Sequence, residues 1–164
     1  MYLANDVFMA ENRSTSESFI VFQLGDTSYG LRSTLVQQLE MIEQMTTVPN
    51  APSFVDGVVF SRGQVIPAIN LRARFGFEKK PHDLRTRLIV INIEGRAVGL
   101  VVDTAREFVM IPMDAIQPPH QAISGLSGKY LEGIATLGER LILILDLKEM
   151  LTLEEVALLS PESA

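Results

Sequence analysis

The sequence predicts an all-β protein in which one β-rich unit occurs twice. Residues 20–31 match residues 89–100, and residues 54–71 match residues 130–147. In these segments, short apolar runs are separated by glycine-centred turns, and the helical segments elsewhere are few and short. This combination favours small barrels or a sandwich over a parallel α/β sheet, whose crossovers need longer helices.

Glycines occupy equivalent positions of the two copies. Gly57 precedes Asn70 by the same interval as Gly133 precedes Asp146. A second glycine pair stands at positions 30 and 99. Either turn geometry or the close approach of another backbone would require glycine at such places.

The first copy is predicted to contain two β-hairpins. Residues 19–24 are β-branched and aromatic, and residues 28–31 can return as their partner strand across a Gly-Asp turn. Residues 57–61 and 64–70 form the second hairpin across Arg62-Gly63. Between the hairpins we predict a short helix.

This helix is predicted over residues 33–40. Ser33 can cap its N-terminus, and Leu35, Val36 and Leu39 fall on one helical face. Prolines at positions 49 and 52 then end the regular structure before the second hairpin.

The second copy repeats this plan after a connection at residues 77–86. Its hairpins pair residues 87–93 with 96–102 and residues 131–137 with 141–146. The proline- and glycine-rich stretch between these hairpins is expected to be irregular.

The predicted organisation is therefore a first barrel subdomain at residues 18–84 and a second at residues 85–160. A capping box, Thr152-Leu-Glu-Glu155, opens a C-terminal helix of the second subdomain that runs to about residue 159. Residues 1–17 and 161–164 are expected to be tails.

Composition excludes several classes of function. The 164-residue chain has a formal net charge of −6, which disfavours a nonspecific nucleic-acid-binding surface. It contains no cysteine, so disulfides and thiolate metal sites are impossible. The N-terminus does not resemble a signal peptide, and the longest apolar run, residues 141–145, is too short to enter and span a membrane. We expect a cytoplasmic protein.

The sequence offers no catalytic constellation, cofactor site or metal site. His82 and His120 lie in proline-flanked loops without a second ligand at metal spacing. A serine nucleophile motif and a phosphate-binding loop both fail around Ser127. Asp103 and Asp146 follow apolar strands, where capping of a turn or helix explains them. We therefore expect a binding protein rather than an enzyme. Arg62 at a hairpin tip could reach a partner or be solvated.

Three segments of the chain carry a family resemblance: Phe54-x-x-Gly57 through Arg62-Gly63 to Leu71-Arg72, then residues 98–107, then Tyr130-Leu-Glu-Gly-Ile134 through Leu147. Together they resemble the CheW family of bacterial chemotaxis coupling proteins and the similar regulatory domain of CheA histidine kinases. The resemblance spans residues 18–160. It implies two tandem SH3-like five-stranded β-barrels and a cytoplasmic, non-catalytic adaptor that is recruited to receptor arrays.

The resemblance also implies two kinds of binding surface. The first would bind the cytoplasmic tip of chemoreceptors in a groove between the barrels, and the second would bind the regulatory domain of a CheA-type kinase. The receptor-binding residues would be Leu35, Val36, Leu39, Arg62, Gly63, Gly99, Ala105 and Phe108. The kinase-binding residues would be Asp56, Gly57, Gln117, Gln121 and Ala122.

The chain departs from the family pattern at four places. Phe60-Ser61 replaces the usual Asn-Leu before Arg62, Asn70 replaces the usual Asp, Gln38 replaces an acidic residue, and Ala122 replaces a larger apolar one. These departures concern the partners rather than the fold. The alternatives are a coupler of a divergent chemosensory pathway, such as motility or pilus control, and a small-ligand-binding β-barrel protein.

Overall fold

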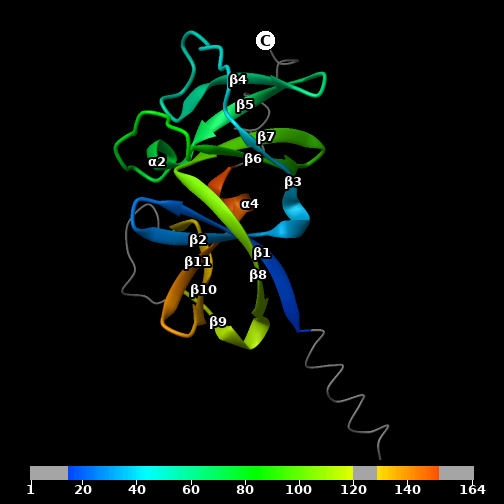
Figure 1. The fold of residues 1–164 in the computed structure, drawn as a ribbon, viewed down its shortest axis with the longest axis vertical. Helices are drawn as coiled ribbons and strands as arrows, with labels where there is room; N and C mark the ends of the chain where they lie inside the picture. Colours follow the sequence, from blue (N-terminus) through cyan, green and yellow to red (C-terminus); the bar gives the residue numbers. More distant parts are fainter. Residues whose placement is uncertain (1–14, 120–128, 152–164) are drawn as a thin grey trace, which may run out of the picture.

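A computed structural model describes residues 15–119 and 129–151. Within these ranges the strands form one six-stranded and one five-stranded sheet. The six-stranded sheet lies in the lower half of Figure 1 and the five-stranded sheet in the upper half. The expected all-β fold class with two small barrels is confirmed. The six-stranded sheet is called sheet A and the five-stranded sheet is called sheet B.

Sheet A has the strand order β8-β1-β2-β11-β10-β9. The bounds of its strands are β1 Ser16–Leu24, β2 Thr27–Arg32, β8 Thr104–Pro112, β9 Ile116–Gln117, β10 Leu131–Leu137 and β11 Arg140–Leu145. Its neighbouring strands are antiparallel except for β2 and β11, which are parallel.

Sheet B has the strand order β3-β6-β7-β5-β4. The bounds of its strands are β3 Val36–Met41, β4 Val55–Ser61, β5 Gln64–Asn70, β6 Arg87–Ile93 and β7 Arg96–Val102. Its neighbouring strands are antiparallel except for β5 and β7, which are parallel. In the described ranges, the 3-10 helices η1 Ser33–Leu35 and η2 Met113–Ala115 and the short α-helices α2 Leu71–Arg74 and α4 Leu147–Met150 accompany the strands.

The two sequence copies exchange their first hairpins. Hairpin β1–β2 of the first copy lies in sheet A with β8 to β11 of the second copy, whereas hairpin β6–β7 of the second copy lies in sheet B with β3 to β5. The sheets therefore do not follow the expected boundary between residues 84 and 85, because each sheet contains strands from both sides of it.

The exchange is reciprocal, and its register is the same on both sides. Gly30 of β2 lies opposite Ile144 of β11, and Gly99 of β7 lies opposite Ala68 of β5. In the repeat, Gly30 is equivalent to Gly99 and Ala68 is equivalent to Ile144. In each of the two contacts, a strand from the first hairpin of one copy pairs with a strand from the last hairpin of the other copy. The two contacts are therefore related as they would be by a two-fold axis.

The glycines of the repeat are explained by close packing. A Cβ added at Gly57 would lie 2.3 Å from the carbonyl oxygen of Thr46, and one at Gly133 would lie 2.8 Å from that of Gln117. A Cβ at Gly99 would lie 2.6 Å from a methyl group of Leu88. Close approach of neighbouring groups therefore excludes side chains at these positions, and at Gly57 a positive φ of 153° adds backbone strain.

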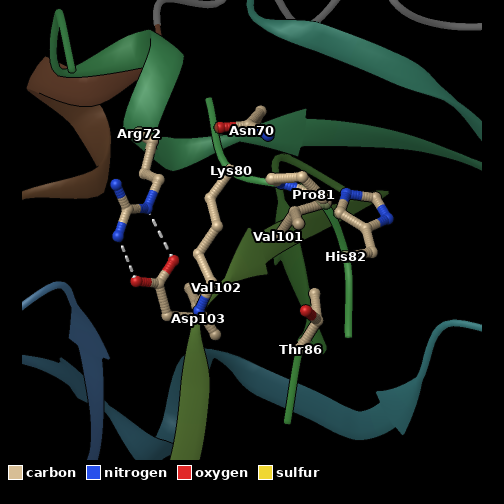
Figure 2. Close-up of a pocket in the computed structure, with 9 residues that line it drawn as sticks. All are labelled: Asn70, Arg72, Lys80, Pro81, His82, Thr86, Val101, Val102 and Asp103. Carbon is tan, nitrogen blue, oxygen red and sulfur yellow. Dashed lines mark hydrogen bonds and ion pairs between the residues drawn. The ribbon is translucent and has the colours of Figure 1, made fainter. Parts of the chain in front are cut away.

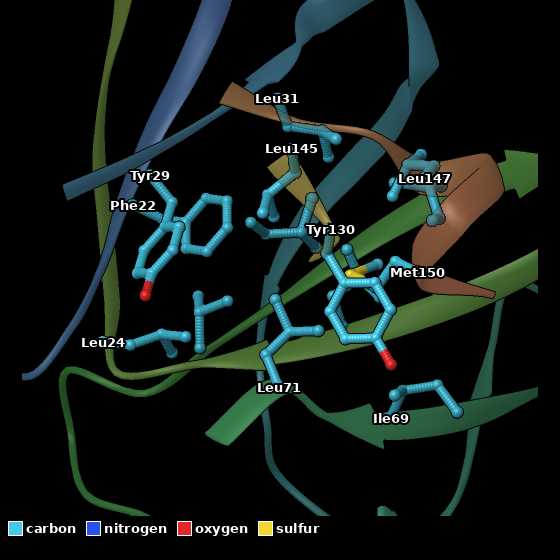
Figure 3. Packing of buried hydrophobic residues seen from close by; sticks show 14 of the residues in the cluster. Phe22, Leu24, Tyr29, Leu31, Ile69, Leu71, Tyr130, Leu145, Leu147 and Met150 are labelled. Carbon is cyan, nitrogen blue, oxygen red and sulfur yellow. The ribbon is translucent and has the colours of Figure 1, made fainter. Parts of the chain in front are cut away.

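The largest buried apolar cluster of the described residues lies between the two sheets, and we call it the seam. It combines residues of both sheets and of the short helices: Ile20, Phe22, Leu24, Tyr29, Leu31, Ile69, Leu71, Phe75, Ile89, Ile91, Val98, Leu100, Val102, Ala105, Tyr130, Leu131, Leu145, Leu147, Met150 and Leu151. Figure 3 shows part of this packing. Two smaller clusters lie within one sheet each, around Phe19 and Ile142 in sheet A and around Ile66 and Val90 in sheet B.

Arg74 joins the two copies at the edge of the seam. Its guanidinium carbon lies 4.6 Å from the ring centroid of Phe54 and 5.4 Å from that of Tyr130, which are equivalent residues of the repeat. Its Nε donates a hydrogen bond of 2.9 Å to the carbonyl of Met150 on α4. Cation–π contacts and this hydrogen bond therefore connect α2 of one copy to α4 of the other.

Three expectations on secondary structure need correction. The helix predicted over residues 33–40 is wrong: only η1 is helical there, and the rest is strand β3, which pairs with β6. Residues 104–112 form strand β8, although no element was expected there. Strand β1 begins at Ser16, inside the expected tail. The predicted C-terminal helix from Thr152 lies outside the described residues.

Candidate functional site

Strands β3 and β8 are the edge strands beside the seam. Among the described strands, β3 pairs only with β6, and β8 pairs only with β1, which is the sheet A hairpin strand equivalent to β6. Leu39 on β3 is 38% exposed and Phe108 on β8 is 60% exposed. An exposed apolar side chain on an edge strand is a candidate contact for a partner.

The strand register shows which face these two side chains occupy. Leu39 lies opposite Ile89, and Phe108 lies opposite Ile20. Directly opposed residues of an antiparallel pair project from the same face of the sheet. Since Ile20 and Ile89 belong to the seam, Leu39 and Phe108 continue the seam face of their sheets outward to the surface.

The segment η1 links these two edges to the seam. It contacts both β1 and β6 and leads directly into β3. Leu35 and Val36 at this point are half-buried and pack against the seam cluster. Leu35 and Val36 therefore form the inner margin of the surface that Leu39 continues.

An open groove of about 840 Å³ lies beside β3 on sheet B. It is lined by Glu40, Met41, Glu43, Gln44, Thr46, Val58, Val59, Phe60, Ser61 and Arg62. Arg62 and Gly63 form the two-residue tip of hairpin β4–β5, both with positive φ (50° and 80°), as in a type I′ turn. Arg62 is exposed and forms no hydrogen bond or ion pair among the described residues.

Gln38 belongs to a small polar network with Ser61 and Glu40, two residues that line this groove. The Gln38 amide donates a hydrogen bond of 3.2 Å to the Ser61 hydroxyl, which donates one of 2.5 Å to the carboxylate of Glu40. Gln38 and Glu40 point to the sheet B face opposite to that of Leu39, because residues alternate along a strand. Gln38 and Ser61, two positions at which the chain departs from the family pattern, thus contact each other.

Asp56 lies in a different polar cluster. Its carboxylate accepts a hydrogen bond of 2.9 Å from the Asn70 amide and lies 3.1 Å from both Lys79 Nζ and His82 Nε2. Only 11% of the Asp56 side chain is exposed. Asn70 also caps α2 by accepting from the Ala73 N–H at 3.1 Å. An amide suits position 70 because a carboxylate there could not donate to Asp56.

Asp103 connects the two sheets at the point where the chain passes from β7 to β8. It accepts hydrogen bonds from Arg72 Nε at 2.8 Å, from Arg72 Nη2 at 2.5 Å and from the Gly25 N–H at 2.7 Å. Figure 2 shows the paired Asp103 and Arg72 side chains. Gly25 is in the turn of a sheet A hairpin and Arg72 is on α2 after β5 of sheet B, so one carboxylate joins both sheets.

The electrostatic environment favours the ionised form of Asp103. Burial alone would raise its pKa, but the hydrogen bonds from Arg72 and Gly25, with the charges of Arg72 and Lys80, outweigh burial and hold the pKa below its ordinary value. The same pairing raises the pKa of Arg72 above its ordinary value, against the opposite effect of burial. Both groups are therefore charged at neutral pH.

The described residues contain no group of three or more His, Cys, Asp or Glu side chains that could hold a metal ion. In the same part of the chain, none of the helices has both the length and the apolar character needed to cross a membrane. What the surface offers is apolar edge strands, an open groove and ion pairs.

Comparison with known proteins identifies the family. The CheW-like domain family matches residues 18–155. The chain belongs to the CheW-like family. A chemotaxis protein CheW of Klebsiella aerogenes is 34% identical over 145 residues, which cover 88% of this chain and 87% of that protein. Protein FrzA of Myxococcus xanthus is 31% identical over 117 residues, which cover 71% of this chain and 73% of that protein.

A solved structure supports the same assignment. The scaffolding protein TtCheW from Thermoanaerobacter tengcongensis matches with a TM-score of 0.77 and 30% sequence identity, over 85% of this chain and 94% of that chain. The resemblance to the CheW family that the sequence motifs indicated is therefore confirmed.

The residues expected to bind a receptor in a CheW-like domain do not all reach the surface. Leu39, Arg62, Gly63 and Phe108 are exposed, and Leu35 and Val36 are half-buried. Gly99 and Ala105 are buried, so they can shape this surface only from beneath. Gly99 allows Leu88 to pack against β7, and Ala105 belongs to the seam.

The residues expected to bind a kinase also differ in how exposed they are. Gln117 on β9 is exposed. Asp56 is largely covered by Lys79 and His82, and Gly57 is buried against the carbonyl oxygen of Thr46. The expected contacts Gln121 and Ala122 lie outside the described residues.

On these two edge strands, sequence reasoning missed two further exposed apolar residues, Met41 on β3 and Met110 on β8. They are 55% and 61% exposed. The signal that could have found them is alternation: Leu39 and Met41, like Phe108 and Met110, are separated by a single residue, as neighbouring side chains on one face of a strand must be.

Proposed function

We propose that this chain is a non-catalytic adaptor that couples chemoreceptors to a CheA-type histidine kinase. Membership of the CheW-like family carries this proposal. It is supported by exposed apolar side chains on two edge strands, which is what a binding protein needs. In this role the protein is recruited from the cytoplasm to receptor arrays.

The proposed receptor-binding surface consists of η1, β3 with Leu39, β8 with Phe108, and the hairpin tip at Arg62-Gly63. The apolar residues would bury the apolar side chains of a helical receptor tip. Arg62 has a charged group free to donate to that tip, and such a contact sets orientation.

The proposed kinase-binding surface includes the region of Asp56 and Gly57 on sheet B and Gln117 on sheet A. Gln121 and Ala122, which lie outside the described residues, belong to this proposal through the family resemblance alone. Because Lys79 and His82 cover Asp56, a kinase domain approaching this region would first meet those two side chains.

The experiment is calorimetric titration of the protein with a receptor cytoplasmic fragment and, separately, with a kinase regulatory domain. Leu39→Asp should abolish receptor binding, because a carboxylate would be forced into an apolar contact. Arg62→Ala should weaken it by about 1–3 kcal/mol, the usual cost of losing a charged hydrogen bond. Kinase-domain affinity should stay within a few fold for both variants.

Thermal melts serve as the control for folding. Leu39 is 38% exposed and Arg62 is exposed, so both variants should melt close to the wild type. A Leu39→Asp protein that melts much earlier and loses both partners would show that Leu39 is a core residue. Unchanged receptor affinity in both variants would contradict the proposed receptor surface.

A further inference from the structure

The connection between α2 and β6 is held against sheet B, and we call its residues 77–86 the strap. At its start, the N–H of Phe77 donates a hydrogen bond of 2.7 Å to the carbonyl of Arg72. In its middle, Lys79 and His82 each lie 3.1 Å from the carboxylate of Asp56 on β4. Figure 2 shows strap residues on one side of a cavity of only about 10 Å³, which strands β5 and β7 also line. The strap is therefore packed on the sheet.

Hydrogen bonds also fix the backbone of the turn at the end of the strap. The Asp83 carboxylate accepts hydrogen bonds from the N–H groups of Arg85 at 2.8 Å and Thr86 at 3.2 Å. The Asp83 N–H donates one of 2.9 Å to the Thr86 hydroxyl. Arg87 Nη1 donates a hydrogen bond of 2.8 Å to the carbonyl of Leu84. The backbone on both sides of Leu84, and its own carbonyl, are therefore held in place.

The side chain of Leu84 nevertheless lies in solvent. Leu84 is 83% exposed, the highest value among the large apolar residues that the structure describes as exposed. Scattered exposed apolar residues need no explanation by themselves. An apolar side chain on a fixed turn, however, loses little conformational freedom when a partner covers it, so more of the free energy of burial appears as affinity. Leu84 is therefore preorganised for contact with a partner.

The charge around Leu84 indicates the chemistry of that partner. Residues 77–87 contain four Lys and Arg residues and two Asp and Glu residues, so their formal net charge is +2 with His82 neutral, whereas the whole chain carries −6. Arg85 follows Leu84, is exposed, and has a side chain that forms no hydrogen bond or ion pair among the described residues. A protein surface with an apolar pocket and an acidic rim complements this turn. A membrane fits less well, because two surplus charges and one leucine give only weak attachment to anionic lipid.

We infer that Leu84 and Arg85 are contact residues of the kinase-binding surface, and that Asp56 is a positioning residue that holds the strap presenting them. The inference rests on the proposed function and names the residues that carry it on sheet B. Both carboxylate oxygens of Asp56 already have a polar partner within 3.1 Å. The Asp56 side chain is only 11% exposed, so an approaching kinase domain contacts the strap before it contacts Asp56.

The test is calorimetric titration of variants of the full chain with a kinase regulatory domain. Leu84→Ser should weaken binding about 5- to 30-fold, as expected for an apolar side chain that a partner buries. Arg85→Glu should weaken it about 3- to 10-fold at low salt, and this loss should shrink as the salt concentration rises. Both variants should melt close to the wild type and keep their affinity for a receptor fragment, since neither side chain is buried or belongs to the proposed receptor surface.

Each of these variants has a matched control. Leu141→Ser replaces a leucine that is 61% exposed on β11 of sheet A. Arg96→Glu makes the same change of charge at an exposed arginine in sheet B. Arg96 follows β6 whereas Arg85 precedes it, so the two arginines are about 20 Å apart along that strand. Both controls should bind the kinase domain like the wild type.

A double-mutant cycle tests the positioning role of Asp56. Asp56→Ala should weaken kinase-domain binding and speed the hydrogen exchange of the strap amides, because the contacts of Lys79 and His82 are lost. Combined with Leu84→Ser, it should give a loss smaller than the product of the two single losses, since both changes remove the same contact. A loss equal to the product would show that Asp56 contacts the kinase domain itself.

The remaining outcomes separate the inference from the proposed function. If Leu84→Ser binds the kinase domain as tightly as the wild type does, the proposed function stands and the inference is wrong. If Leu84→Ser weakens binding but Arg85→Glu does not, the partner surface is not acidic. If anionic phospholipid vesicles sediment the wild type but not Leu84→Ser, the turn binds a membrane instead. A wild type that binds no kinase domain refutes the proposed function, and the inference with it.

Discussion

Replacing Asp103 by Asn should destabilise the protein at neutral pH. The Asp103 and Arg72 side chains are only 13% and 23% exposed, and the carboxylate accepts two hydrogen bonds from Arg72 and one from Gly25. An asparagine amide would present N–H donors to the Arg72 guanidinium, which has only donors. The loss of charged hydrogen bonds at this degree of burial should cost about 2 kcal/mol.

The cost should depend on pH in a defined direction. The pKa of Asp103 is lower in the folded protein than its ordinary value of about 3.9. Its charge therefore contributes fully to stability above that ordinary value, and the contribution is lost as the pH falls through the lower, folded-state pKa. The difference between the wild type and Asp103→Asn should be constant from about pH 5 to pH 7 and should shrink towards pH 2.

Urea unfolding at several pH values measures this difference. Other carboxylates titrate alike in both proteins and cancel in the comparison. The matched control is Glu107→Gln, which breaks an ion pair of similar length, 2.6 Å to Arg140, whose side chains are 44% and 47% exposed. Its cost should be below about 0.5 kcal/mol. Equal stability of Asp103→Asn and wild type at pH 7, or a difference that persists undiminished at low pH, would refute the reasoning.

Three further substitutions test sheet B. Gly57→Ala should cost about 3 kcal/mol in chemical denaturation, because the new methyl group would meet the carbonyl oxygen of Thr46. Gly63→Ala, which has open space around it and a positive φ of 80°, should cost about 1 kcal/mol from backbone strain alone. Since Gly57 also has a positive φ, of 153°, the difference between the two losses measures the packing, and equal losses would contradict the packing argument. Asn70→Asp should cost about 1–2 kcal/mol at pH 7, since the donor to Asp56 is replaced by a second negative charge, and no loss would show that the amide is dispensable.

The hairpins could be predicted from the sequence because their signals are local. Apolar runs meet at turns such as Arg62-Gly63, and the repeat shows each pattern twice. Strand β3 was mistaken for a helix because Leu35, Val36 and Leu39 have helical spacing. Pairing with β6 decides the conformation instead, and the alternation of Leu39 and Met41 is too short to outweigh the helical spacing in the sequence.

The exchange of hairpins could not be predicted from local pattern. Because the two copies have equivalent strands, β2 presents the same pattern to β5 as it does to β11, and β7 likewise fits either partner. The sequence reveals that the strands pair, but not whether they pair within a copy or between copies. The connection from β7 to β8 decides this in the fold, since only Asp103 separates the two strands and they lie in different sheets.

Of the candidate site, the exposed residues Leu39, Arg62 and Phe108 could be inferred through the family resemblance. The burial of Gly99 could not, because a glycine that permits close packing and a glycine that permits a partner's approach look identical in a sequence.

The reciprocal exchange also sets the order in which this chain can fold during its synthesis. Strand β1 ends at Leu24, whereas its partner β8 begins only at Thr104. At a synthesis rate of about 5–20 residues per second, hairpin β1–β2 waits about 4–16 s for that partner to be made. During this wait the apolar faces of β1 and β2 have no sheet to join. Pairings this distant in sequence also slow folding, and these apolar faces stay exposed to aggregation until the second half of the chain is complete.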